Sequence, residues 1–216
     1  MERIICLLIG YACGLFQTAY IMGKIYHTDI RKQGSGNLGS TNVMRTLGKK
    51  AGALNLLCDC LKCVAAILIV RALFEDRYAD ILPLLSLYAA AGCILGHNFP
   101  FYLNFKGGKG IAASVGLLAA FDWRLLLICA VVFFALFFTT HYVSLCSISA
   151  YVIAFILMVV FGQRGDYHMD QSHMLELYVV MAFLTVLALF RHKKNIQRLL
   201  DGTESQIYLG KKKKNQ

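Results

Sequence analysis

A stretch rich in glycine and lysine interrupts the hydrophobic sequence near its middle. Residues 106–110 read Lys-Gly-Gly-Lys-Gly and precede an apolar segment, 111–121, that is predicted to be helical. Glycine lets backbone amides approach a ligand, lysine supplies positive charge, and a helix N-terminus attracts anions. The stretch therefore predicts a phosphate-binding loop. The expected ligand-binding residues are Lys106, Gly107, Gly108, Lys109 and Gly110.

This loop does not match the Walker nucleotide-binding motif. Gly110 follows Lys109 where that motif has a serine or threonine that binds magnesium. Position 103 is leucine, where the motif has its first glycine. Phosphate binding is therefore indicated, but a magnesium-bound nucleotide is not.

A second polar stretch, 34–45, also contains closely spaced glycines. Gly34, Gly36 and Gly39 match the G-x-G-x-x-G pattern, but no β-strand precedes them, so a dinucleotide fold is not indicated. Its side chains could bind phosphate or carbonyl oxygens. The alternative is an ordinary loop whose glycines form turns and whose polar residues cap a helix. The polar side chains are Ser35, Asn37, Ser40, Thr41, Asn42 and Arg45.

A third polar stretch, 191–204, follows the last apolar run. If that run continues as a helix, His192 and Asn195 share one face, and Arg198 could line a pocket beside them. Glu204 is expected to pair with a nearby cation and fix the tail. The alternative is a basic helix end whose long side chains lie at the membrane interface.

The elements that must position these stretches are membrane helices. Of the 216 residues, 58% are hydrophobic and 16% are charged, and the mean hydropathy is +0.59. This composition predicts a single all-α polytopic membrane domain over 1–216. Residues 111–121 would span only about 16 Å as a helix, which predicts a short or broken span. The seven predicted spans are 4–22, 51–70, 81–95, 111–121, 125–138, 142–161 and 174–190.

The charges predict how these spans are oriented. Sixteen of the 22 lysines and arginines lie in the loops 24–50 and 106–110 and in the basic tail 191–216. Positively charged loops favour the cytoplasmic side, so we expect an external N-terminus and a cytoplasmic tail. All three polar stretches then face the cytoplasm and could form one site. This distribution accounts for the net charge of +10 without nucleic-acid binding.

The second span contains ionisable residues at depth. Asp59 and Lys62 are expected to form an ion pair on a face shared with Asn55, although Lys62 could instead reach the phosphate site. His97 is expected to be structural. A C-x-x-C at Cys60–Cys63 could indicate zinc or redox chemistry, but all eight cysteines are expected to be small buried side chains. We expect neither a metal nor a cofactor.

Together, the three polar stretches resemble the motifs of a family of bacterial membrane acyltransferases. Members of that family transfer an acyl group from acyl-phosphate to glycerol 3-phosphate. The sequence differs from the usual pattern at Ser40, where alanine is typical, and at Lys193 and Lys194, which replace Arg-Glu. The residues that carry the resemblance are 34–37, Thr41, Asn42 and Arg45; Gly96, His97, Pro100 and 105–110; and His192, Asn195, Ile196, Arg198, Leu199, Gly202 and Glu204.

The resemblance implies a seven-helix bundle in the bacterial cytoplasmic (inner) membrane, active as a monomer, with its site facing the cytoplasm. It implies the first acylation of phospholipid synthesis, which gives lysophosphatidate and inorganic phosphate. The implied catalytic residues are Ser35, Arg45, His192 and Asn195. The implied substrate-binding residues are Gly36, Asn37, Thr41, Asn42, Lys106, Gly107, Gly108, Lys109, Gly110 and Arg198.

The proton acceptor of the implied reaction remains open at this point. His192 could accept the proton of the attacking hydroxyl or orient a phosphate, and the phosphate of a substrate could take the proton instead.

The competing prediction is a transporter of a phosphorylated metabolite. A transporter would carry charge near the middle of the membrane and would typically contain a repeat, and no clear repeat is visible.

Overall fold

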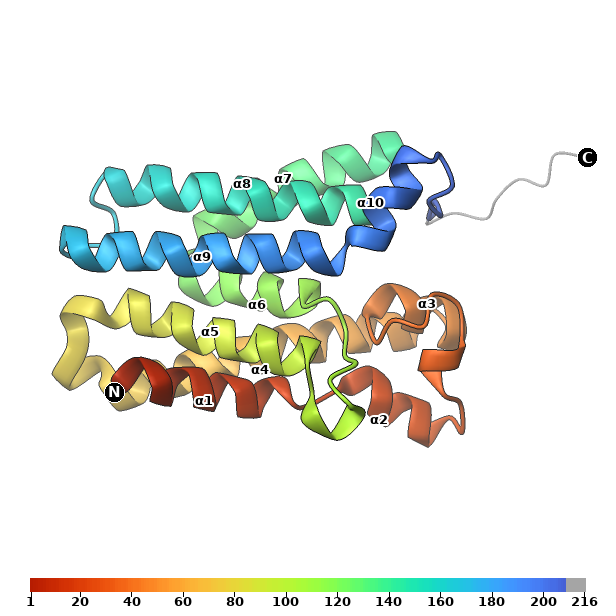
Figure 1. Ribbon diagram of the computed structural model, residues 1–216, viewed down its shortest axis with the longest axis horizontal. Coiled ribbons are helices and arrows are strands. Elements are labelled where there is room, and N and C mark those ends of the chain that lie inside the picture. The colour runs from red at the N-terminus through yellow and green to blue at the C-terminus, as the bar shows by residue number, and fades with distance from the viewer. Residues whose placement is uncertain (209–216) are drawn as a thin grey trace, which may run out of the picture.

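The computed structural model describes residues 1–208, which form a bundle of α-helices with short 3₁₀ turns (Figure 1). The N-terminus lies at one end of the bundle, and α3 and α10 lie at the other. The lysines at 211–214 lie outside the described residues. The α-helices are α1 Glu2–Gly14, α2 Thr18–Ile25, α3 Ser40–Leu47, α4 Lys49–Tyr78, α5 Leu82–Asn98, α6 Ile111–Phe121, α7 Trp123–Thr140, α8 Val143–Gln163, α9 Gln171–Arg191 and α10 Lys193–Leu200. The 3₁₀ turns are η1 Ile30–Lys32, η2 Ala79–Ile81 and η3 Phe101–Leu103.

Five stretches of the described chain are long and apolar enough to cross a membrane. One of them, Lys49–Leu103, contains both α4 and α5, and the apolar α6 is shorter than the rest. Large apolar side chains such as Leu61, Val131 and Val186 are exposed on the helices, as expected of surfaces that face lipid. The prediction of an all-helical membrane protein is confirmed. The other stretches are Glu2–Ile25, Trp123–Thr140, Val143–Gln163 and Gln171–Arg191.

Three predicted boundaries were wrong. The predicted loop at 71–80 is mostly helical, because α4 continues to Tyr78 through residues that are compatible with a helix. The predicted turn at 122–124 is the single residue Asp122, whose side chain caps α7 by accepting a hydrogen bond from the Arg124 amide at 3.0 Å. The first predicted span is broken between α1 and α2.

Helices α1 and α5 pack closely because glycines meet at their crossing. A Cβ atom on Gly10 or Gly14 of α1 would overlap backbone carbonyl oxygens of α5. A Cβ atom on Gly92 or Gly96 of α5 would overlap those of α1. Small residues at four-residue spacing let membrane helices approach each other in this way. The contact places the end of α5, where the 106–110 loop begins, beside the break in the first span.

Distant side chains satisfy the backbone at the break between α1 and α2. Gln17 is 1% exposed, and its Nε2 donates to the carbonyl oxygens of Gly14 at 3.2 Å and His97 at 3.1 Å. Lys62 Nζ of α4 donates to the carbonyl oxygen of Phe16 at 2.7 Å. Broken helices are tolerated in membrane proteins where side chains supply the missing hydrogen bonds. This break therefore depends on α4 and α5.

Two small apolar clusters gather the polar stretches at the end of the bundle opposite the N-terminus. In the first, Leu38 and Val43 pack with Leu103 of η3. In the second, Met44 packs against Ile207 of the tail and against residues of α7 and α8. Residues within or next to all three predicted polar stretches therefore meet at one end of the fold (Figure 1).

Candidate active site

A buried polar network lies beneath the site. Lys62 Nζ is 2.8 Å from Asp59 Oδ1, which confirms the predicted ion pair. It also donates to the carbonyl oxygen of Phe16 and lies 2.8 Å from His97 Nδ1. Because an ammonium has three N–H groups and accepts no hydrogen bonds, these three contacts satisfy it. The alternative in which Lys62 binds phosphate is therefore excluded in this conformation.

The same network continues to the N-terminus of α3. Asn55 Nδ2 lies 2.9 Å from Asp59 Oδ2 and 2.9 Å from Ser40 Oγ. Thr18 Oγ1 of α2 donates to Asp59 Oδ1 at 3.2 Å. Asp59 thus connects α4 to α2 directly and to α3 through Asn55, which fits the structural role predicted for it.

His97 supports the glycine-rich loop at 106–110. Its ring is 3% exposed and lies against Gly108, where a Cβ atom would overlap Nε2. The amides of Gly107 and Gly108 donate to the carbonyl oxygens of Asn98 and His97, each at 3.1 Å. Both amides are used within the loop in this conformation, and phosphate binding by Gly107 and Gly108 stays a prediction. These contacts support the structural role predicted for His97.

Arg191 holds the same loop from its other side. Its Nη2 donates to the carbonyl oxygens of Gly107 at 3.0 Å and Gly108 at 2.6 Å, and its guanidinium lies 5.2 Å from the Phe99 ring centroid. From the sequence, Arg191 was predicted only to be one of the charges of the basic tail. One signal could have identified it: a glycine-rich loop exposes carbonyl groups that need donors, and an arginine at a membrane helix end can supply several.

The third motif meets the loop through Lys109. Its Nζ donates to Asn195 Oδ1, and Asn195 Nδ2 donates to Glu204 Oε1 at 2.6 Å. Arg198 Nε donates to Glu204 Oε2 at 2.6 Å, so the predicted pairing of Glu204 with a cation is confirmed. Ser144 of α8 also donates to Glu204 at 2.8 Å, a contact that the sequence did not suggest.

The pKa of Lys109 reflects both its burial and the charges around it. This pKa is lowered to about 8, mainly by burial; the charges of Arg198, Arg191 and Arg45 act in the same direction, and Glu204 opposes them. Burial alone would raise the pKa of Glu204, but hydrogen bonds from Asn195, Arg198 and Ser144 hold that pKa below its ordinary value. The loop at 106–110 therefore lies within electrostatic reach of Arg45 and of the tail.

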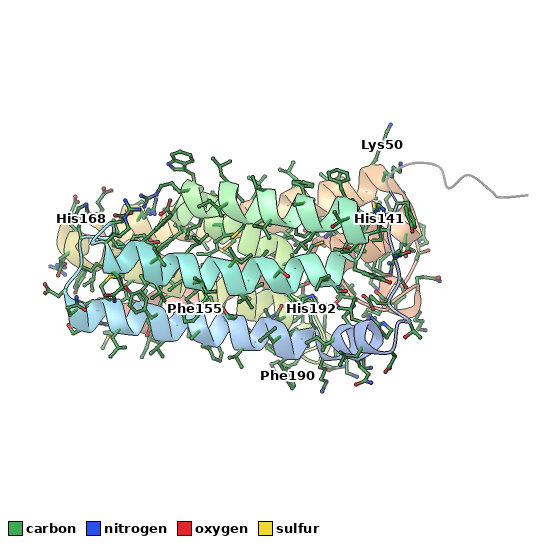
Figure 2. All side chains as sticks on the ribbon, turned by 90° about the horizontal axis from the view of Figure 1, so that it is seen from above. Lys50, His141, Phe155, His168, Phe190 and His192 are labelled. Carbon is green, nitrogen blue, oxygen red and sulfur yellow. The ribbon has the colours of Figure 1, made fainter. Side chains whose placement is uncertain are left out.

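His192 has one nitrogen in use. The residue is 3% exposed, and Nδ1 lies 2.8 Å from the carbonyl oxygen of Ala188, so Nδ1 must carry the proton of that hydrogen bond. Burial, reinforced by the charge of Lys109, lowers the pKa of His192 to about 4. At neutral pH its Nε2 is consequently a hydrogen-bond acceptor. Figure 2 shows His192 and Lys50 toward the same end of the bundle, with His168 at the opposite end.

The 34–45 loop is folded around Asn42. Asn42 is 1% exposed, its Oδ1 accepts from the Ser35 amide at 2.9 Å, and its Nδ2 donates to the carbonyl oxygens of Ile30 at 3.2 Å and Gln33 at 3.0 Å. These bonds give Asn42 a structural role in the loop, and substrate binding by Asn42 stays a prediction. Gly36 has a φ of +69°, a conformation that favours glycine and turns the chain after Ser35.

The sequence matches known proteins along almost its whole length. The chain matches the family model described as glycerol-3-phosphate acyltransferase over residues 4–202. It is 42% identical to a glycerol-3-phosphate acyltransferase of Clostridioides difficile (strain 630) over 97% of both chains. A protein of the same name from Lactiplantibacillus plantarum is 38% identical over 97% of this chain and 94% of its own. This chain belongs to the glycerol-3-phosphate acyltransferase family.

Solved structures of the family share the fold. A crystal structure of PlsY (YgiH), an integral membrane glycerol 3-phosphate acyltransferase, in its glycerol 3-phosphate form, superposes with a TM-score of 0.82. That protein is 30% identical, and 96% of each chain is covered. Its lysophosphatidic acid form superposes with a TM-score of 0.80.

In this acyltransferase, the residues implied by the family differ in exposure. Asn195 and His192 are buried beside Lys109 or its neighbours, whereas Ser35, Arg45 and Lys106 are exposed. The remaining loop residues, Gly36, Asn37 and Thr41, are half-buried, and Gly110 is buried with a φ of +80° where α6 begins. Within residues 1–208, no group of three or more His, Cys, Asp or Glu side chains could hold a metal ion.

Proposed function

We propose that this acyltransferase uses acyl-phosphate as its donor and acylates the C1 hydroxyl of glycerol 3-phosphate. The products are 1-acylglycerol 3-phosphate and inorganic phosphate. One observation carries the proposal: Lys109 is half-buried among several cations and is held by the neutral amide of Asn195. Positive charge that is fixed in place without being neutralised suits two substrates that each bear phosphate.

The proposed reaction needs no covalent enzyme intermediate. The hydroxyl oxygen attacks the carbonyl carbon, a new carbon–oxygen bond forms, and the bond from carbon to the phosphate oxygen breaks. With a pKa of about 4, His192 is a weak base, so its Nε2 accepts a hydrogen bond from the attacking hydroxyl and orients it. The proton then leaves with the phosphate. Asn195 keeps Lys109 beside that histidine.

The proposed anion-binding groups come from two loops. Arg45, Lys106 and Lys109 bind the phosphates, and the Ser35 hydroxyl donates to the carbonyl oxygen as negative charge develops there. The exposed position of Ser35 leaves its hydroxyl accessible to a substrate. Arg198 acts through Glu204, to which it is bound, and so stabilises the tail beside the site.

The proposed placement is a seven-span protein in the bacterial cytoplasmic membrane, with the N-terminus outside and the site facing the cytoplasm. The excess of lysine and arginine at the site end supports this orientation. Reporter fusions at Met1 and after residue 208 test it, because the two reporters should lie on opposite sides. The same side for both would contradict it. We also propose that one chain carries a complete site.

The donor is tested with purified protein and labelled glycerol 3-phosphate. We expect lysophosphatidate with acyl-phosphate and none with acyl-CoA or acyl carrier protein. Lys50→Gln, at an exposed lysine near the site end, serves as the control and should retain full activity. Transfer from the thioesters alone would refute the proposed donor.

The competing transporter function is not favoured. The deep charges, Asp59 and Lys62, neutralise each other and are fully hydrogen-bonded within the described bundle. A transport pathway would need polar groups that remain available to a solute near the middle of the membrane.

A further inference from the structure

A basic cavity lies at the site end of the bundle, and its lining differs from the residues of the proposed active site. It has a volume of about 310 Å³, within the range of small-ligand sites. Its walls come from α2, the 27–31 segment and one residue of the 34–45 loop, and they include none of the proposed catalytic or substrate-binding residues. The lining residues are Tyr20, Gly23, Lys24, His27, Thr28, Asp29, Ile30, Arg31 and Leu38.

The cations of this cavity are arranged around one aromatic ring. Lys24 Nζ lies 5.5 Å and the Arg31 guanidinium 5.7 Å from the centroid of Tyr20. Tyr20 is itself packed edge-on against Tyr102, at a centroid distance of 6.2 Å. Cation–π contacts of this kind orient a cation without neutralising its charge.

The one acid of the cavity is already paired. Asp29 accepts from Arg31 Nε at 3.0 Å and from Nη2 at 3.1 Å. Within residues 1–208, Lys24 has no carboxylate partner, and both Lys24 and His27 are exposed. The cavity therefore retains net positive charge in its lining, and Lys24 is available to an anion.

The surroundings of the cavity include exposed apolar and aromatic side chains. Ile21, Ile25 and Tyr26 of the same segment are exposed by 38%, 67% and 58%. The nearby η3 turn, tied to this region by Tyr102, exposes Phe101. Aromatic and basic residues side by side are typical of the membrane interface, and basic pockets on its cytoplasmic side bind anionic headgroups.

We propose that this cavity binds the phosphate headgroup of an anionic phospholipid, whose acyl chains lie along α2. Lys24 binds the phosphate, and Arg31 contributes the part of its charge that Asp29 leaves. A soluble phosphate would gain the charge contacts alone, whereas a lipid also covers the exposed apolar side chains. The site is separate from acyl transfer, so its occupant is a bound lipid and not a substrate.

Native mass spectrometry of the delipidated protein in a neutral detergent tests the proposal. Phosphatidylglycerol is titrated against phosphatidylcholine with the same chains, without acyl donor, and bound lipid is counted. We expect phosphatidylglycerol to bind more tightly. Lys24→Gln should weaken that binding about fivefold, from the roughly 1 kcal/mol that one lysine contributes near a membrane surface. The matched control, Lys50→Gln, should bind as the wild type does.

Asp29→Asn gives a change of opposite sign. Removing the carboxylate releases Arg31, while asparagine can still cap η1, so phosphatidylglycerol should bind several-fold more tightly. Acyl transfer by each variant reports whether it is folded and tests the proposed reaction independently. Equal binding of the two lipids, or equal weakening by Lys24→Gln and Lys50→Gln, would overturn the proposal. Displacement of phosphatidylglycerol by millimolar inorganic phosphate would reassign the cavity to free phosphate.

Discussion

The two ends of the bundle differ in the groups that bind their lysines and arginines. At the end that contains the N-terminus and the α8–α9 connection, arginines are paired with carboxylates. Arg3 binds Glu176 through two hydrogen bonds of 2.6 and 2.7 Å, and Arg124 lies 2.7 Å from both Asp122 and Asp166. At the site end, Arg198 and Arg31 are also paired, with Glu204 and Asp29, but neutral groups hold Lys109 and Arg191.

The partners of Lys109 and Arg191 are an amide and carbonyls. Lys109 binds the side-chain oxygen of Asn195, and Arg191 binds the carbonyl oxygens of Gly107 and Gly108. Such partners fix the position of a cation but leave its charge available, whereas a carboxylate cancels it. The comparison indicates that one end is built for stability and the other for binding anions.

The largest effect is expected when the central cation of the site end is removed. Lys109→Met should lower kcat by about 10²–10³, the usual loss when one donor to developing charge is deleted. Lys50→Met, at the same end but outside the cluster, is the control and should keep wild-type turnover. The kcat of both variants is measured in steady-state assays in detergent. If Lys109→Met retained near-normal kcat, the charge of Lys109 would not be required for acyl transfer.

A smaller loss is expected from Arg191→Gln. The carbonyl groups of Gly107 and Gly108 would lose their donor, and the loop carrying Lys109 would shift relative to His192. We expect kcat to fall about tenfold to a hundredfold, since small displacements of reacting groups have effects of this size, with less change in KM for glycerol 3-phosphate. Arg191→Lys should restore part of the rate. A change in KM alone would instead make Arg191 a substrate-binding residue.

Sequence alone predicted the features that depend on neighbouring residues. The helix at Ile111–Phe121 was predicted with its observed bounds, because Gly110 and Asp122 delimit an apolar run. The Asp59–Lys62 pair followed from helical spacing in an apolar segment, and the pairing of Glu204 with a cation from its position in a basic tail; the cation is Arg198.

The features that were missed depend on residues distant in sequence. The break before α2 requires Lys62 and Gln17 to donate to backbone carbonyls, which no local pattern reveals. Asn42 looks like any other polar residue of its loop, and only the folded chain directs it inward. The glycine amides at 107 and 108 were assigned to a ligand because composition does not show where a backbone hydrogen bond goes.

The activity is expected to depend on pH through Lys109 at the site end. Lys109, with a pKa of about 8, loses its proton as pH rises through that value, and only about a tenth remains charged one unit above it. Because the charged form is the active one, kcat/KM should fall on the alkaline side with a midpoint near pH 8. His192, with a pKa of about 4, stays neutral above pH 5 and adds no acidic limb.

Lys109→Arg provides the control for this profile. Arginine keeps its charge across the range, so the alkaline limb should disappear even if the rate is lower. The measurement is kcat/KM from pH 5.5 to 9.5, which reports groups of the free enzyme. A limb that persisted in Lys109→Arg would belong to another group.

The smallest effect on activity is expected at the opposite end. Arg3→Gln removes the paired hydrogen bonds to Glu176, whose carboxylate keeps a hydrogen bond from Tyr88 at 2.7 Å. Both partners are about a third exposed, so the loss should be at most about 1 kcal/mol, or roughly 2–4 °C in Tm for a chain of this size. Turnover at 25 °C should not change. If Arg3→Gln lowered kcat while leaving Tm intact, charge at this end would also serve catalysis, and the contrast between the ends would fail.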